Sequence, residues 1–142
     1  MIAVRASAEA PGDGVIGSLV TLIQNDVTAS VSQEAVVYPA TLTNYSSSVA
    51  QGDSTIKSQI AADVANCPDE QFVLVGYSQG AQVVGDALGG GGNLGTPATP
   101  GVPSSTAARI LAVIQMGDPR RVPGFSFDVG SDPGATGLFP QP

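Results

Sequence analysis

The sequence predicts an α/β fold with a doubly wound, mostly parallel sheet. Strand-like apolar runs alternate with segments whose apolar residues recur at helical spacing, which is the pattern of βαβ units. The run at residues 110–116 shows little alternation, as expected for a strand covered by helices on both faces. With 142 residues the chain has the length of one domain, so we expect residues 1–142 to form a single domain.

The first unit reads as strand, loop and helix. Residues 2–4 form a short apolar run, and residues 11–14 carry the Pro and Gly of a loop. Residues 16–25 then predict an amphipathic helix. Its apolar positions are Ile16, Leu19, Val20 and Ile23.

The second unit begins with a predicted strand at residues 34–38, which Pro39 stops. Residues 41–51 are polar and predict a loop, in which Tyr45 is a candidate for lining a substrate groove. A helix is predicted to start at Ser54 as N-cap. It ends before Pro68, next to the lone Cys67, for which a buried thiol or half of a disulfide are both open readings.

The third unit carries the chemistry. The β-favouring run at residues 72–75 leads to Ser78, which stands between Gly76 and Gly80, and residues 79–88 read as a helix. This is the pattern of a nucleophile elbow, in which a strained turn lifts a serine hydroxyl out of the sheet. The backbone N–H of Gln79 would then form half of an oxyanion hole. A strand-to-helix turn that merely needs small residues is the structural alternative.

Residues 89–105 are rich in Gly, Pro, Thr and Ser and predict a flexible surface loop; the lysine of a phosphate-binding loop is missing there. The fourth predicted strand, residues 110–116, ends near Asp118, which we expect to be a turn residue. Ser7, Ser78 and Asp118 thus all follow strands, where ligands bind in open α/β sheets.

The composition limits which classes of partner the protein can bind. The net charge is −7, apolar residues make up 42% and charged residues 12%. An acidic chain without a basic patch cannot neutralise many phosphates, so nucleic acid and anionic membrane are excluded as partners. We expect no cofactor, no metal site, no transmembrane span and no signal peptide. Histidine is absent, although a serine nucleophile normally needs an imidazole base.

The motifs as a whole resemble one family. Residues 67–69 and 73–81 are similar to the nucleophile segment of the cutinase and acetylxylan esterase group, small secreted serine esterases that are minimal relatives of the α/β-hydrolases. Residues 45–52 and 115–119 resemble its acetylxylan esterase members, and residues 5–9 resemble the first-strand loop that supplies an oxyanion donor.

The resemblance implies a flavodoxin-like strand order and carboxylic ester hydrolysis through an acyl-enzyme. Ser78 would be the nucleophile, and Ser7 and Gln79 would form the oxyanion hole. The implied substrate is a neutral ester, either a cutin-like polyester or an acetylated plant polysaccharide. A secreted monomer is expected.

In that family the catalytic Asp and His, the last strand and the last helix lie beyond the segment matched here, and the cysteine partner of Cys67 precedes it. We therefore expect a domain clipped at both ends, inactive or impaired, with an exposed sheet edge prone to aggregation. Asp118, Asp128 and Asp132 are poor replacement bases, since an ordinary carboxyl pKa is about 4. The alternatives are a catalytically dead binding module or fragment and, less in keeping with the motifs, a flavodoxin-like binder.

Overall fold

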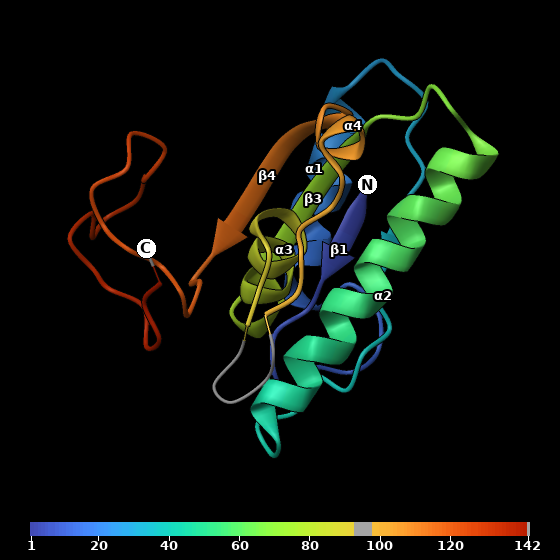
Figure 1. Ribbon diagram of the computed structural model, residues 1–142. Coiled ribbons are helices and arrows are strands. Elements are labelled where there is room, and N and C mark those ends of the chain that lie inside the picture. Colours follow the sequence, from blue (N-terminus) through green and yellow to red (C-terminus); the bar gives the residue numbers. More distant parts are fainter. Residues whose placement is uncertain (93–97, 142) are drawn as a thin grey trace.

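The computed structural model describes residues 1–92 and 98–141. Its centre is one parallel sheet in the order β2-β1-β3-β4 (Figure 1). The strands are β1 (Ile2–Val4), β2 (Glu34–Ala35), β3 (Phe72–Tyr77) and β4 (Ile110–Met116). This order confirms the predicted α/β class and the flavodoxin-like arrangement, in which the switch point lies between β1 and β3.

Helices cover both faces of the sheet, as predicted for a doubly wound fold. They are α1 (Gly17–Asp26), α2 (Tyr45–Asn66), α3 (Gln79–Gly89) and the short α4 (Ser104–Ala107), with a 3-10 turn η1 at Gly14–Ile16. Two apolar clusters mark the two faces. The cluster against α2 and α3 contains Ile2, Val4, Ile56, Leu74 and Val83, and the cluster against η1 and α1 contains Ala3, Ile16, Val20 and Val75.

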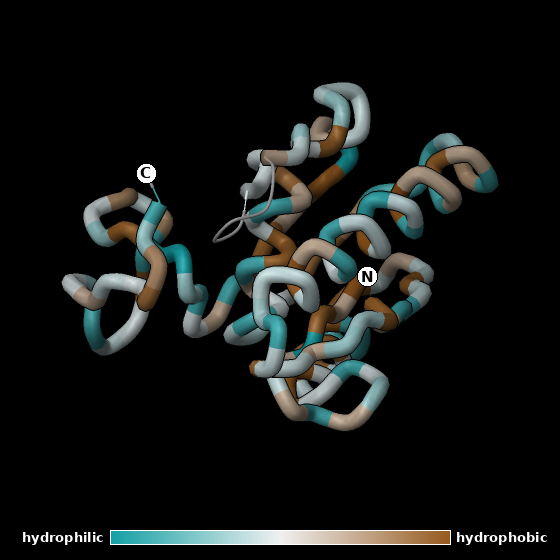
Figure 2. The backbone as a smooth tube through the Cα atoms, turned by 60° about the horizontal axis from the view of Figure 1, so that its bottom comes forward, coloured by the Kyte–Doolittle hydropathy of each residue, from teal (hydrophilic) through white to brown (hydrophobic). Residues whose placement is uncertain are grey.

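The alternation within β1 explains these two clusters. Its residues Ile2 and Val4 point to one face while Ala3 points to the other, and all three are buried. The most hydrophobic stretches of the chain accordingly run through the middle of the molecule (Figure 2). No helix among the described residues is both long and apolar enough to cross a membrane.

The predicted start of the second helix was wrong. Helix α2 begins at Tyr45 with Asn44 as N-cap, so residues 45–51 are helical and Ser54 lies inside the helix. A Ser- and Gly-containing stretch became helix because it packs: Gly52 lacks a Cβ that would lie 2.7 Å from Cγ2 of Val83 on α3. Tertiary packing here outweighs weak local propensity.

Smaller differences lie in the connections. Strand β2 is shorter than predicted, although the Val36 N–H still donates to the Ala3 carbonyl over 2.9 Å. Helix α4 occupies part of the predicted loop at residues 89–105; residues 93–97 of that loop lie outside the described residues. Cys67 is exposed, so the buried-thiol reading was wrong.

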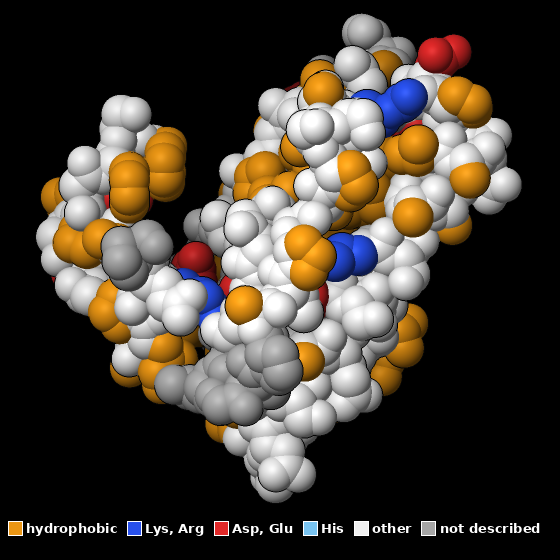
Figure 3. Space-filling model, viewed as in Figure 1, with side chains coloured by type: hydrophobic (Ala, Val, Ile, Leu, Met, Phe, Trp, Pro, Cys, Tyr) orange, Lys and Arg blue, Asp and Glu red, His pale blue; other side chains and the backbone are white. Residues whose placement is uncertain are grey.

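The expectation that helices cover both faces of the strand at residues 110–116 was wrong. Strand β4 is at the edge of the sheet and exposes apolar side chains, including Leu111 at 64% and Val113 at 39%. Beyond it the chain runs without helix or strand through described residues 117–141 and lies to one side of the sheet (Figures 1 and 3). Phe125 and Phe127 in that segment stack on one another with ring centroids 5.1 Å apart.

Candidate active site

Ser78 lies in a strained turn between β3 and α3. Its backbone has φ 52° and ψ −119°, a conformation that costs a non-glycine residue about 1–3 kcal/mol. The turn is held from both sides: the Ser78 N–H donates to the Met116 carbonyl of β4 at 2.8 Å, and the Ser78 carbonyl accepts from the N–H groups of Ala81 and Gln82. The serine is half-buried rather than fully enclosed.

The two glycines flanking Ser78 make the close approach of strand and helix possible. A Cβ on Gly76 would lie 2.6 Å from the Gly80 carbonyl oxygen. A Cβ on Gly80 would overlap the backbone carbonyl oxygens of Val4 and Arg5. Because the opposing atoms are backbone, neither clash can be relieved by a rotamer change.

The side chain of Gln79 ties the turn to three other segments. It is fully buried, accepts from the Ser48 hydroxyl on α2 over 2.7 Å, and donates to the Thr41 carbonyl over 3.0 Å. Its Nε2 also lies 3.1 Å from Oγ of Ser7, in the loop after β1. The helix N-terminus that carries Ser78 is therefore fixed to the loops that follow β1 and β2.

The loop that carries Ser7 is itself well braced. Ala8 adopts a left-handed conformation with φ 63°, and its N–H donates to the Ala40 carbonyl at 2.7 Å. The Glu9 carboxylate accepts from the N–H of Ala6 at 2.6 Å and from that of Val15 at 2.8 Å. Among the described residues, the backbone N–H groups of Ser7 and Gln79 donate to no backbone carbonyl outside the regular hydrogen bonding of the helices and strands.

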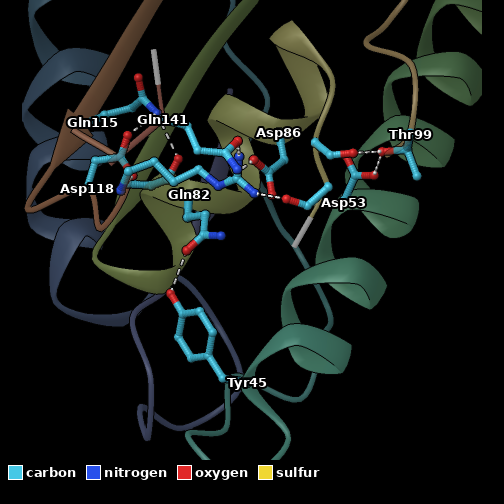
Figure 4. A network of polar contacts seen from close by, with 12 residues as sticks. Tyr45, Asp53, Gln82, Asp86, Thr99, Gln115, Asp118 and Gln141 are labelled. Atoms are coloured by element: carbon cyan, nitrogen blue, oxygen red, sulfur yellow. Dashed lines mark hydrogen bonds and ion pairs between the residues drawn. The ribbon is translucent and has the colours of Figure 1, made fainter. Parts of the chain in front are cut away.

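Tyr45 lies at the start of α2, with its ring half-buried. Its hydroxyl donates to Oε1 of Gln82 at 2.8 Å (Figure 4), and its ring meets that of Phe139 with centroids 5.8 Å apart. Burial, followed by the nearby charges of Asp118 and Asp86, raises the pKa of Tyr45 to about 12. The tyrosine is neutral at physiological pH, and its ring rather than its hydroxyl is left for a ligand.

A buried acid lies farther along α3. Asp86 forms an ion pair with Arg120 (Nε to Oδ1, 3.2 Å) and a hydrogen bond with the side chain of Gln82. Burial raises the pKa of Asp86 to about 6, although the Arg120 charge opposes that rise.

Asp118 is a turn residue, as predicted. One of its oxygens accepts from the Arg120 N–H at 2.9 Å, and its carbonyl accepts from the N–H of Arg121 at 3.1 Å. Burial raises the pKa of this carboxyl too. Asp128 is taken up by its own turn, because it accepts from the N–H groups of Gly124 and Phe125 and pairs with Arg121.

Comparison with known proteins assigns the family. The family model described as Cutinase matches residues 1–135. The chain belongs to the cutinase family.

Relatives and solved structures agree with this assignment. Cutinase 11 of Verticillium dahliae is 39% identical over 137 residues, covering 89% of this chain and 46% of its own. The acetylxylan esterase of Hypocrea jecorina is 37% identical, covering 89% and 45%. The solved catalytic core domain of acetyl xylan esterase from Trichoderma reesei superposes with a TM-score of 0.88 at 32% identity, covering 99% of this chain and 72% of that one. The chain thus spans somewhat less than half of the length of these two curated relatives, and its family is one of ester hydrolases.

The geometry brings together most of the residues that the sequence singled out in this cutinase-family chain. Ser78, Gln79 and Ser7 lie at the carboxyl ends of the adjacent strands β1 and β3, linked through the Gln79 side chain. Tyr45 reaches the same region through Gln82 on the first turn of α3. Their chemical roles stay predictions. Among the described residues, no cluster of three or more His, Cys, Asp or Glu side chains is placed to hold a metal ion.

The sequence did not identify Gln82, Asp86 or Arg120 as residues of the site. It also did not predict the hydrogen bonds of the Gln79 side chain. One signal was present: Gln82 and Asp86 are polar residues four apart on a helix otherwise read as apolar, so they share one of its faces. A charged residue on a buried face usually has a partner. Nothing in the sequence indicated that the partner is Arg120, beyond β4.

Proposed function

We propose that this chain carries the nucleophile and the oxyanion hole of a carboxylic ester hydrolase of the cutinase or acetylxylan esterase type. Oγ of Ser78 would attack the ester carbonyl carbon, and the N–H groups of Ser7 and Gln79 would stabilise the developing negative charge on its oxygen. Collapse of that intermediate would expel the alcohol and leave an acyl-enzyme, which water then hydrolyses. The observation that carries this proposal is the strained Ser78 at the N-terminus of α3, beside backbone N–H groups with no backbone acceptor.

We propose further that these 142 residues form a single domain and that turnover by them alone is absent or impaired. The serine proton needs a base, and the sequence contains no histidine. Loss of the base from a serine hydrolase leaves about 10³ to 10⁴-fold catalysis over water, which is small beside an intact enzyme.

For substrate we propose a neutral ester, either a cutin-like polyester or an acetylated polysaccharide. The support is the similarity to proteins named cutinase and acetylxylan esterase and the net charge of −7, which disfavours anionic substrates. We propose that the protein acts outside the cell, as a monomer and without nucleic acid or membrane partners.

A second candidate function is a binding module that holds the same ester or polysaccharide without chemistry. The missing imidazole favours it for these residues. The two functions differ in whether Ser78 can be made nucleophilic by supplying a base.

The deciding experiment is labelling of the folded chain with a fluorophosphonate probe, with and without millimolar imidazole, using Ser78→Ala as control and circular dichroism to verify folding. We expect slow labelling that imidazole accelerates and that Ser78→Ala abolishes. Folded protein that stays unlabelled even with imidazole would contradict the nucleophile and leave the binding module. Rapid Ser78-dependent labelling without imidazole would contradict the proposed impairment.

A further inference from the structure

Two aromatic rings from distant parts of the chain meet beside the Ser78 turn. Tyr45 opens α2 and Phe139 lies near the end of the described chain, and their rings are inclined by 53° with centroids 5.8 Å apart. Both side chains are only half-buried. Because the Tyr45 hydroxyl is engaged with Gln82, the pair presents hydrocarbon surface rather than a hydrogen-bond donor.

This aromatic pair is linked to the Ser78 turn through Gln82. Gln82, which holds the Tyr45 hydroxyl, comes four residues after Ser78, and its N–H donates to the Ser78 carbonyl at 3.2 Å. Gln82 therefore joins the aromatic pair to the turn that carries Ser78.

Phe139 is delivered to this place by pairing within the segment after β4. Its N–H donates to the Pro119 carbonyl at 2.7 Å, and the N–H of Gly137 donates to the Arg121 carbonyl at 2.8 Å. Residues 137–141 thus run alongside residues 119–121, and Phe139 moves with the turn that contains Arg120.

Arg120 fixes that turn to the body of the protein. Its guanidinium pairs with Asp86 of α3 at 3.2 Å, with side chains only 12% and 5% exposed. The same group donates to the Gly92 carbonyl after α3 and to Oε1 of Gln141 (Figure 4). A poorly solvated, many-sided contact of this kind sets a position more firmly than a surface ion pair does.

We propose that Tyr45 and Phe139 form an aromatic wall that binds an alkyl group of the ester, with Phe139 determining specificity and Arg120 acting as a positioning residue for it. This inference rests on the proposed esterase function. The alkyl group can belong to the acyl part or to the alcohol part of the ester, and both present the same chemistry to the rings.

The test measures ester binding rather than turnover. In the Ser78→Ala chain, hexyl acetate, methyl hexanoate and methyl acetate are titrated while the backbone amide signals of Gln79 and Gln82 and the ring signals of Tyr45 and Phe139 are followed by NMR. The hexyl and hexanoyl esters show whether the alcohol or the acyl side meets the wall, and methyl acetate is the ester without an alkyl chain.

We expect Phe139→Ala to weaken binding of at least one long ester on the order of tenfold, as for the loss of contact to about two methylene groups, and to change methyl acetate less than twofold. Phe139→Leu should recover part of the loss. Arg120→Gln should reproduce the chain-length selectivity of Phe139→Ala, and Arg120→Lys should do so more weakly. The matched control is Phe127→Ala in the same segment, 75% exposed, which should leave all three affinities unchanged.

Unchanged binding of both long esters in the folded Phe139→Ala and Phe139→Leu variants would overturn the wall, and so would an equal loss in Phe127→Ala. Long esters that shift the ring signals but not the Gln79 amide would keep the wall and contradict the proposed reaction site. Long esters that shift the Gln79 amide signal equally with and without the Phe139 ring would keep the proposed reaction site and contradict the wall.

Discussion

At Ser78 the backbone conformation that the proposed nucleophile requires works against stability. A glycine would adopt φ 52° without strain, at the smaller cost of extra freedom in the unfolded chain. We expect Ser78→Gly to raise the free energy of unfolding by about 1 kcal/mol while abolishing labelling. Urea denaturation of Ser78→Gly beside Ser78→Ala, which keeps the strain, measures this. Equal stability of the two variants would show that the turn stores no strain.

Gly80 offers a second test at a single position. Its missing Cβ leaves room for the backbone of β1, so Gly80→Ala should lower the free energy of unfolding by about 3 kcal/mol. Gly89 at the end of the same helix has open space around it, since a Cβ added there would meet no atom within 4 Å. Gly89→Ala should therefore be neutral or stabilise by up to about 1 kcal/mol. Thermal denaturation of both variants compares them, and similar losses would refute the close-approach argument.

Between elements, the buried Gln79 side chain is the main connection. Gln79→Leu keeps the approximate volume but leaves the Ser48 hydroxyl and the Thr41 carbonyl without this partner. We expect a loss of about 3 kcal/mol in unfolding free energy and slower imidazole-assisted labelling of Ser78. Gln51→Leu on the exposed face of α2 is the control and should change neither quantity. If Ser78 in the Gln79→Leu variant is labelled at an unaltered rate, the Gln79 side chain has no role in the site.

The raised pKa of Asp86 on α3 predicts that the free energy of unfolding depends on pH. Asp86 titrates near 6 when folded and near 3.8 when unfolded, so the folded state binds its proton more tightly. This contribution is fully present below about pH 4 and is lost as pH rises through 6, on the order of 1–3 kcal/mol. The difference in unfolding free energy between wild type and Asp86→Asn should therefore fall from pH 4 to pH 7, as measured by urea titrations. A pH-independent difference would place Asp86 in a better-solvated setting.

The element boundaries show how much of the fold can be predicted from the sequence. β1, β3, β4 and α3 follow from apolar runs and helical spacing, because those patterns reflect local geometry. The first two turns of α2 do not, since they are packed through tertiary contacts, in which Ser48 and Val49 are buried and Gly52 lies against Val83 of α3. The same limit applies to the site: Ser78, Gln79 and Ser7 are carried by a local motif and a family resemblance, whereas the partnership of Asp86 with Arg120 is set by how the chain returns after β4.

For the molecule as a whole, the edge strand β4 is the weak point. Its outer backbone is unpaired among the described residues and its apolar side chains are exposed, a combination that favours intermolecular pairing. We expect Leu111→Lys to slow aggregation on heating several-fold, followed by light scattering. Leu22→Lys on α1, where the native leucine is 62% exposed, is the control. If Leu22→Lys protects equally, added charge rather than the sheet edge accounts for the effect.

The contacts of Gln79 determine when the proposed site forms during folding. Its side chain joins residues 72, 38 and 31 positions away in sequence. Contacts over such distances form only when the sheet and its covering helices have assembled. An unfolded or newly made chain therefore lacks the arrangement that would activate Ser78. The proposed site forms only when the tertiary structure forms.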